Sequence, residues 1–268
     1  AQFLAEVDAL AGGLHALGLQ RGDRVGIWSP NRAEWLVTQF ATARVGIVLV
    51  NVNPAYRLSE LEYALKISGC RALISAEKLK TSQYLEMIAT VRPKLPALEF
   101  VIRMGAGKTP GMLNYDDVVA DGRARGSRAT LAAIEAALGC MDAINIQFTS
   151  GTTGNPKGAT LTHHNIVNNA RFIAMAMRFS EADSLCIPVP LYHCFGMVLA
   201  VLACVATGAA MVFPGEAFEP RAALAAVAEE RCTALHGVPT MFIAELDHPE
   251  FASFDLSSLR TGIMAGSP

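Results

Sequence analysis

One stretch of sequence decides the fold of this chain: Ile144-Asn-Ile-Gln-Phe-Thr-Ser-Gly-Thr-Thr-Gly-Asn-Pro-Lys-Gly-Ala159. Its first residues predict a short apolar strand, and glycines and hydroxyl residues follow as far as Pro156-Lys157-Gly158. Glycine lets backbone N–H groups approach an anion closely, and successive N–H groups in such a loop form an anion-binding nest. The stretch therefore predicts a loop that holds a phosphate chain. Its hydroxyl and ammonium donors belong to Thr149, Ser150, Thr152, Thr153 and Lys157.

The loop differs from the Walker A motif, G-x-x-x-x-G-K-[ST], at two positions. Counted from Gly151, the second glycine of that motif falls on Pro156, and its Ser or Thr falls on Gly158. The hydroxyl that binds Mg²⁺ in Walker loops is therefore missing. A plain turn is the other alternative, because Gly, Ser, Thr and Pro gather in ordinary loops. Ten consecutive residues of this kind directly after an apolar strand favour a phosphate loop.

Residues Thr149–Gly158 resemble the pyrophosphate-binding loop of adenylate-forming enzymes along their whole length. That family includes acyl-CoA synthetases, aryl-CoA ligases, luciferases and peptide-synthetase adenylation domains. The resemblance covers nearly the whole chain and is closest to fatty-acid–CoA ligases, particularly medium-chain members. The other segments that resemble family landmarks are, in order, Arg21-Gly-Asp-Arg-Val25, Thr162-His-His-Asn-Ile-Val167, Pro190-Leu-Tyr-His-Cys-Phe-Gly196, Gly237-Val-Pro-Thr240 and Leu259-Arg-Thr-Gly-Ile-Met-Ala-Gly-Ser-Pro268.

The composition indicates a globular α/β chain with a large core, because 52% of its 268 residues are hydrophobic. A net charge of −2 provides no field to attract nucleic acid or an acidic membrane surface. Any affinity for ATP must therefore be local. Glu6 and Asp8 interrupt the apolar pattern of the first helix, so no signal peptide is expected.

The cysteines show no C-x-x-C pair, which gives zinc or redox chemistry no support. Reduced thiols in a cytoplasmic protein are the expected state. Cys194 lies beside His193, but adjacent residues on a chain usually point apart, which argues against a thiol nucleophile. The six cysteines are Cys70, Cys140, Cys186, Cys194, Cys204 and Cys232.

One long segment, residues 184–215, contains no Asp, Glu, Lys or Arg. A membrane span needs about 20 apolar residues in continuous helix, and Pro188, Pro190 and Gly208 interrupt this run. We expect a buried strand, a loop, a buried helix and a second buried strand.

Short apolar strands alternate with helices along the chain, which predicts two α/β lobes with mostly parallel sheets flanked by helices. Helices are expected over residues 3–17, 33–45 and 59–68. Strands are expected over residues 25–28, 46–52, 71–75, 100–102 and 262–265.

The polar, Arg-rich segment 121–129 is the expected boundary between the two lobes. The first lobe is predicted to cover residues 1–130, and the second, with the phosphate loop, residues 131–268. Residues 104–111 contain Gly105, Gly107 and Lys108 but lack full nucleotide-loop spacing, so a surface loop is expected there.

The chain ends at Pro268, directly after a predicted strand. The resemblance implies that family members continue with an acidic Mg²⁺ ligand, a carboxylate that holds the ribose, and a mobile domain with a catalytic lysine. We therefore expect a fragment of the large N-terminal domain, with no metal ligand assigned. By itself such a fragment is expected to bind nucleotide weakly and not to turn over.

The resemblance implies ATP, Mg²⁺ and coenzyme A as co-substrates. A carboxylate attacks the α-phosphate of ATP, giving an acyl adenylate and pyrophosphate, and coenzyme A then displaces AMP. One charge about 4 Å from a phosphate is worth only about 4 kcal/mol at an effective dielectric of about 20, so Lys157 needs further cations. Catalysis is assigned to Lys157 and His193. Cofactor binding is assigned to Thr149, Ser150, Gly151, Thr152, Thr153, Gly154, Lys157, Gly266, Ser267 and Pro268.

The histidines have different expected roles. The resemblance places His193 in the acyl pocket near the adenylate, whereas a lone histidine would be read as structural. His163 and His164 are expected to start a helix rather than to act in catalysis, and His236 to edge the acyl tunnel. Residues 195–205 are apolar enough to line that tunnel, but the same pattern describes any buried helix.

Three other functions stay open: an aryl-CoA ligase, an adenylation domain that loads a carrier protein, and a non-catalytic nucleotide-binding module. Carrier-loading domains for amino acids typically place an acidic residue where this chain has Tyr192-His193, which favours a coenzyme A ligase. Acyl chain length, pathway and subunit count are not set by the sequence.

Overall fold

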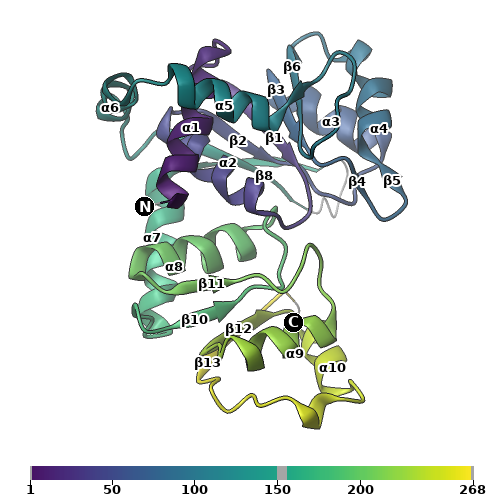
Figure 1. Cartoon of the computed structure of the whole chain (residues 1–268), viewed down its shortest axis with the longest axis vertical. Coiled ribbons are helices and arrows are strands. Elements are labelled where there is room, and N and C mark those ends of the chain that lie inside the picture. The colour runs from purple at the N-terminus through teal and green to yellow at the C-terminus, as the bar shows by residue number, and fades with distance from the viewer. Residues whose placement is uncertain (1, 150–155, 267–268) are drawn as a thin grey trace. The chain divides into compact units, whose positions relative to one another are not determined.

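The computed structural model describes residues 2–149 and 156–266, and its contacts divide the chain into two compact units. The first unit runs from Ala1 to His163 and the second from His164 to Pro268. Each unit has its own sheet, mostly parallel and flanked by helices. In Figure 1 the first unit is coloured purple to teal and the second green to yellow. The predicted α/β class, with two lobes, is confirmed.

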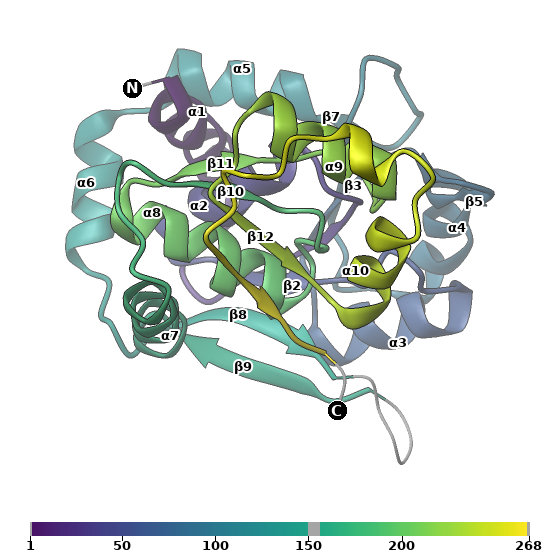
Figure 2. The ribbon, with the colours of Figure 1, turned by 90° about the horizontal axis from the view of Figure 1, so that it is seen from below.

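The first unit is built on a seven-stranded sheet. All neighbouring strands in it are parallel except the last pair, β8 and β9, which form an antiparallel hairpin (Figure 2). A separate two-stranded hairpin joins β4 (Lys78–Leu79) to β5 (Ser82–Gln83). The strands of the large sheet are, in spatial order, β7 (Leu113–Asn114), β6 (Phe100–Arg103), β3 (Ala72–Ser75), β1 (Arg24–Trp28), β2 (Val48–Asn51), β8 (Ala143–Phe148) and β9 (Gly158–Thr162).

Helices cover both faces of this sheet, because its connections run in two directions. The chain passes from β1 to β2 one way along the sheet and from β2 through β3 to β6 the other way. Right-handed crossovers therefore place the connecting helices on opposite faces. One layer contains α1 (Gln2–Ala16), α2 (Ala33–Arg44), α5 (Tyr115–Arg125) and α6 (Arg128–Ala136), and the other contains α3 (Leu58–Ser68) and α4 (Tyr84–Val91).

Two aromatic rings fix the carboxyl end of β1. Trp28 and Tyr84 are fully buried and stacked, with ring centroids 3.7 Å apart. The indole Nε1–H donates to the carbonyl of Asn53, and the Tyr84 hydroxyl donates to that of Pro54. These bonds tie α4 and the loop after β2 to the central strand of the sheet.

Glycines let α1 and α5 approach closely. A Cβ atom added at Gly13 would lie 2.2 Å from the Val118 carbonyl oxygen, and one at Gly122 would lie 1.9 Å from that of Ala9. Contacts this short leave no room for any side chain. The Arg-rich segment 121–129 is therefore not a linker: its first half is the end of α5, packed against α1.

The division between the units differs from the predicted boundary between residues 130 and 131. It falls after His163, because β8 pairs with β2 in the first sheet and β9 pairs with β8. Both strands that flank the predicted phosphate loop therefore belong to the first unit.

The second unit is built on a parallel four-stranded sheet. One apolar cluster lies on the face that carries α7 (His163–Ala176), the π-helix η2 (Phe195–Leu202) and α8 (Ala203–Thr207). A second cluster, around Cys186, Val227 and Cys232, lies on the face that carries α9 (Pro220–Glu229) and α10 (Pro239–Leu246). The strands are, in spatial order, β11 (Ala210–Val212), β10 (Ser184–Cys186), β12 (Ala234–Gly237) and β13 (Thr261–Met264).

The charge-free segment 184–215 forms β10, a loop, the π-helix with α8, and β11, in the predicted order. The second strand is not buried as predicted, because β11 lies at the edge of the sheet and its residues are exposed or half-buried. None of the helices among residues 2–149 and 156–266 is long and apolar enough to cross a membrane.

Replacing Gly122 with alanine is expected to destabilise the first unit by about 3 kcal/mol, because the new methyl group would overlap the backbone of α1. The higher helix propensity of alanine offsets about 1 kcal/mol at most. Urea unfolding measures the effect. The matched control is Gly139→Ala, where the nearest atom lies 3.8 Å from the new Cβ. Equal stability of the two variants would contradict the close packing of α1 on α5.

Candidate nucleotide and acyl site

The stem of the predicted phosphate loop is an antiparallel hairpin. Phe148 of β8 pairs with Gly158 of β9. Beyond that pair, the Thr149 N–H donates to the Lys157 carbonyl at 2.9 Å, and the Lys157 N–H donates to Thr149 Oγ1 at 3.4 Å. These two bonds fix both ends of the loop. The Lys157 side chain is exposed and makes no ion pair with any described residue.

Most of the loop lies outside the described residues, and so does the end of the chain. The anion nest and the hydroxyl donors therefore stay predictions. The assigned residues concerned are Ser150, Gly151, Thr152, Thr153, Gly154, Ser267 and Pro268.

A buried pair of asparagines holds β8 in place. Asn145 is fully buried, and its Nδ2 donates to the Leu49 carbonyl at 3.0 Å and to Asn51 Oδ1 at 2.9 Å. Both acceptors lie on β2. The loop thus starts at the carboxyl end of β8, next to the carboxyl end of β2 and close to the point where the direction of the connections reverses. Ligands of open α/β sheets bind at this edge.

In the second unit the connections reverse direction between β10 and β12. The loop after β10 carries His193, and the end of β12 carries His236 and Gly237. Gly266 follows β13 in a left-handed conformation with φ +92°. It lies beside Val238, because an added Cβ would be 3.1 Å from that side chain. The structure therefore brings His193, His236 and Gly266 to the carboxyl edge of one sheet.

The geometry of His193 defines its hydrogen-bonding state. Its Nδ1 accepts the backbone N–H of Phe195 at 3.1 Å. A backbone N–H only donates, so in the neutral ring the proton is on Nε2. Neighbouring protein atoms partly desolvate the ring and lower the pKa of His193 below its usual value, which keeps the ring neutral at neutral pH. His193 thus presents an Nε2–H donor on an exposed side chain.

Cys194 does not have the surroundings of a nucleophile. Its Sγ lies 3.7 Å from His193 Nδ1, but that nitrogen already accepts the Phe195 N–H. Burial raises the pKa of the Cys194 thiol, which favours the unreactive protonated form. All six cysteines are free thiols.

His163 and His164 open α7, as predicted. The His163 N–H donates to the Asp142 carbonyl, and burial lowers the pKa of its ring. The His164 carbonyl accepts the side-chain amide of Asn168. Both residues belong to the start of the helix.

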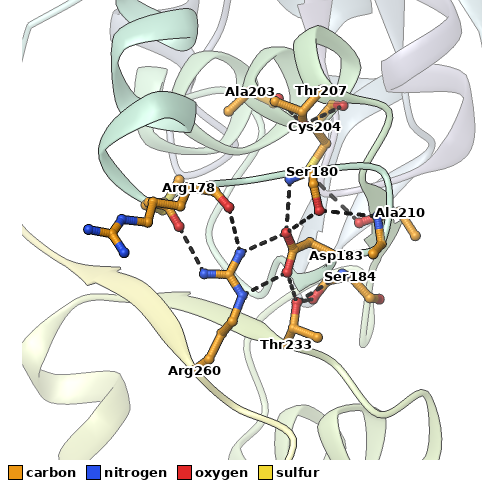
Figure 3. A network of polar contacts seen from close by, with 12 residues as sticks. Arg178, Ser180, Asp183, Ser184, Ala203, Cys204, Thr207, Ala210, Thr233 and Arg260 are labelled. Atoms are coloured by element: carbon orange, nitrogen blue, oxygen red, sulfur yellow. Dashed lines mark hydrogen bonds and ion pairs between the residues drawn. The ribbon is translucent and has the colours of Figure 1, made fainter.

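An ion pair that was missed in the sequence fastens the strand before Gly266 (Figure 3). Asp183 is buried just before β10, and Arg260 precedes β13. The Arg260 Nε and Nη2 atoms bind the two Asp183 oxygens at 2.9 and 2.6 Å, and Thr233 Oγ1 donates to the same carboxylate at 2.7 Å. The remaining Arg260 donors bind the carbonyls of Met177 and Arg178 after α7.

This network joins β10, β12, β13 and the end of α7 through one guanidinium group. The Arg260 guanidinium holds the pKa of Asp183 well below its usual value. A signal existed in the sequence, because each charge directly borders an apolar strand. The sequence does not indicate that Asp183 pairs with Arg260, because the two residues are 77 positions apart.

Comparison with known proteins identifies the family. The model of the AMP-binding enzyme family matches residues 1–268. YngI of Bacillus subtilis is 46% identical over the whole chain, which covers 51% of YngI, and the mitochondrial medium-chain acyl-CoA ligase ACSF2 of Mus musculus is 44% identical, with 46% of its length covered. The crystal structure of the anthranilate CoA ligase AuaEII with anthranoyl-AMP superposes with a TM-score of 0.87 at 26% identity, covering 99% of this chain and 49% of that one.

The chain belongs to the AMP-binding enzyme family. It spans about half the length of the curated relatives it matches. The predicted family is confirmed.

Asp183→Asn is expected to lower the free energy of unfolding by about 2 kcal/mol at pH 7, because it removes the counter-charge of Arg260. The loss is smaller than for a fully buried pair, since water reaches Arg260. Urea unfolding measures it, with Asp255→Asn as control, because the Asp255–Arg231 pair is exposed. A control variant as unstable as Asp183→Asn would contradict this role.

The same pair predicts a pH dependence. The pKa of Asp183 is lower in the folded than in the unfolded state. The contribution of the Asp183–Arg260 pair to the free energy of unfolding is therefore complete above the unfolded-state pKa of about 4. The contribution is lost as the pH falls through the folded value. The stability difference between the wild type and Asp183→Asn should therefore narrow below about pH 4.

Proposed function

We infer that the protein containing this chain activates a fatty acid with ATP, giving an acyl adenylate and pyrophosphate, and then transfers the acyl group to coenzyme A with release of AMP. The observation that carries this inference is the β8–β9 hairpin, which fixes Thr149 and Lys157 at the two ends of the loop. Membership of the AMP-binding enzyme family supports it.

The hairpin suits the first step. A carboxylate oxygen attacks the α-phosphorus, the bond to the bridging oxygen of the β-phosphate breaks, and negative charge builds up on pyrophosphate. Donors that are already in place stabilise this charge without reorganisation. The Lys157 ammonium is exposed at the loop base. The Thr149 hydroxyl accepts one N–H and keeps its own proton for donation.

The second unit suits the acyl group. His193 presents an Nε2–H donor beside Phe195, the first residue of an entirely apolar helix. A neutral donor next to an apolar surface fits the carbonyl and aliphatic chain of an acyl adenylate. The 44% identity to a ligase named for medium-chain acids supports an aliphatic substrate. The likeness to an anthranilate ligase shows that this fold also serves aryl acids.

Mg²⁺ enters with ATP as part of the substrate complex, and coenzyme A is the second substrate. The part of the chain that the structure describes contains no cluster of three or more His, Cys, Asp or Glu side chains able to hold a metal ion.

Lys157→Ala is expected to slow acyl-adenylate formation by about 10²–10³ in the whole protein, the usual cost of removing one preorganised donor. ATP–pyrophosphate exchange with a saturating fatty acid measures this step. The control is Lys108→Ala in the surface loop 104–111, which should exchange at the wild-type rate. If Lys157→Ala exchanged as fast as Lys108→Ala, the assignment of the hairpin to pyrophosphate would be wrong.

A panel of acids separates the alternatives. Straight-chain fatty acids, benzoate, anthranilate and amino acids are each tested for AMP release with coenzyme A. A fatty-acid ligase releases AMP fastest with an aliphatic acid. Preference for an aromatic acid, or dependence on a carrier protein in place of coenzyme A, would assign the protein to another branch.

A further inference from the structure

The helix after His193 has an unusual form. Residues Phe195–Leu202 are a π-helix, and the N–H of Ala203 donates to Val198, five residues back, as well as to Ala200. π-Helical segments are rare, are usually a single turn, and are frequent at functional sites. The sequence of this one is Phe-Gly-Met-Val-Leu-Ala-Val-Leu, in which Gly196 is the one residue that disfavours an α-helix strongly. Gly196 lies in the first turn, so the wide register of the residues after it also needs support from outside the segment.

One neighbouring side chain contacts this helix at two positions. His236 lies on β12 and is fully buried. Its Nε2 lies 3.3 Å from the Leu199 carbonyl oxygen, and its ring is stacked on Phe195 with centroids 5.4 Å apart and planes 30° apart. Phe195 and Leu199 are about one turn apart. Neighbouring Leu235 belongs to the cluster on the other face of the sheet.

The polarity of His236 is costly in this position. A carbonyl oxygen only accepts, so Nε2 carries the proton, and Nδ1 has no hydrogen-bond partner among the described residues. Burial lowers the pKa of His236 to about 4, so the ring is neutral at physiological pH. An apolar residue of similar size would avoid burying an unpaired nitrogen. What the imidazole supplies, and an apolar side chain would not, is the bond to Leu199.

Helical register decides which side chains face inward. Each residue of an α-helix turns the chain by about 100°, so one residue added to a hydrogen-bonded turn rotates the side chains beyond it by about that angle. Met197, Val198, Ala200 and Val201 are buried, whereas Leu199 and Leu202 are half-buried. A return to α-helical register would exchange members of these two sets.

We propose that His236 is a positioning residue that holds Phe195–Leu202 in its π register and so sets the length of acyl chain that this helix accepts. The part concerning acyl length rests on the proposed function; the part concerning the helix does not.

The test uses three variants of the whole protein. His236→Leu removes the donor and keeps an apolar side chain, and His236→Gln keeps an N–H that can reach Leu199. Leu235→Ala is the matched control, because it damages the other face of the same strand. Amide hydrogen exchange over residues 198–205 reports the register. ATP–pyrophosphate exchange with short, medium and long straight-chain acids reports selectivity.

His236→Leu is expected to speed amide exchange in residues 198–205 by about tenfold or more and to shift the preferred acid length. His236→Gln should restore both properties, and Leu235→Ala should leave the preferred length unchanged. The proposal is overturned if His236→Gln behaves like His236→Leu, if Leu235→Ala loses the same protection, or if protection falls with no change in preferred length. A wild type inactive with every acid would refute the proposed function, and with it the acyl-length part of the proposal, while amide exchange would still decide the role of His236 in the helix.

Discussion

The pairing of β8 with β2 is the constraint on which the candidate site depends. Asn145 of β8 donates hydrogen bonds to two buried acceptors of β2, the Leu49 carbonyl and Asn51 Oδ1. These polar contacts lie inside an apolar part of the sheet. A slip of one residue would leave these groups unpaired and turn every side chain to the opposite face. The correct register brings Thr149 to the carboxyl edge of the sheet, where the hairpin can present Lys157.

The sequence allowed predictions about short segments, whereas it did not indicate which distant segments pair. Alternating apolar runs predicted the α/β class, which is confirmed. Glycines, hydroxyls and one lysine predicted a phosphate loop, of which the structure describes the hairpin stem. The boundary at residue 130 was misplaced because a polar, Arg-rich composition resembles a linker. Residues 121–125 instead complete α5, where Gly122 permits contact with α1. Such a contact depends on a partner more than 100 residues away.

The candidate site likewise has residues that the sequence predicted and contacts that it did not. Motif context singled out Lys157, His193 and Gly266, and His236 was expected near the acyl tunnel. The hydrogen bond from His236 to Leu199 could not be predicted from the sequence, because an apolar octapeptide does not indicate a π-helix. The Asp183–Arg260 pair was missed for a related reason. Each charge alone resembles a solvated residue at a strand end, and only their meeting reveals a joint among three strands and a helix.

The antiparallel edge strand β9 has an evolutionary consequence. A hairpin needs no crossover helix, so residues between its strands can be inserted, deleted or exchanged without rebuilding the parallel part of the sheet. The segment between the two strands can therefore diversify separately from the scaffold. Loop transplantation between relatives becomes a practical route to altered enzymes, provided that the Phe148–Gly158 closure is kept.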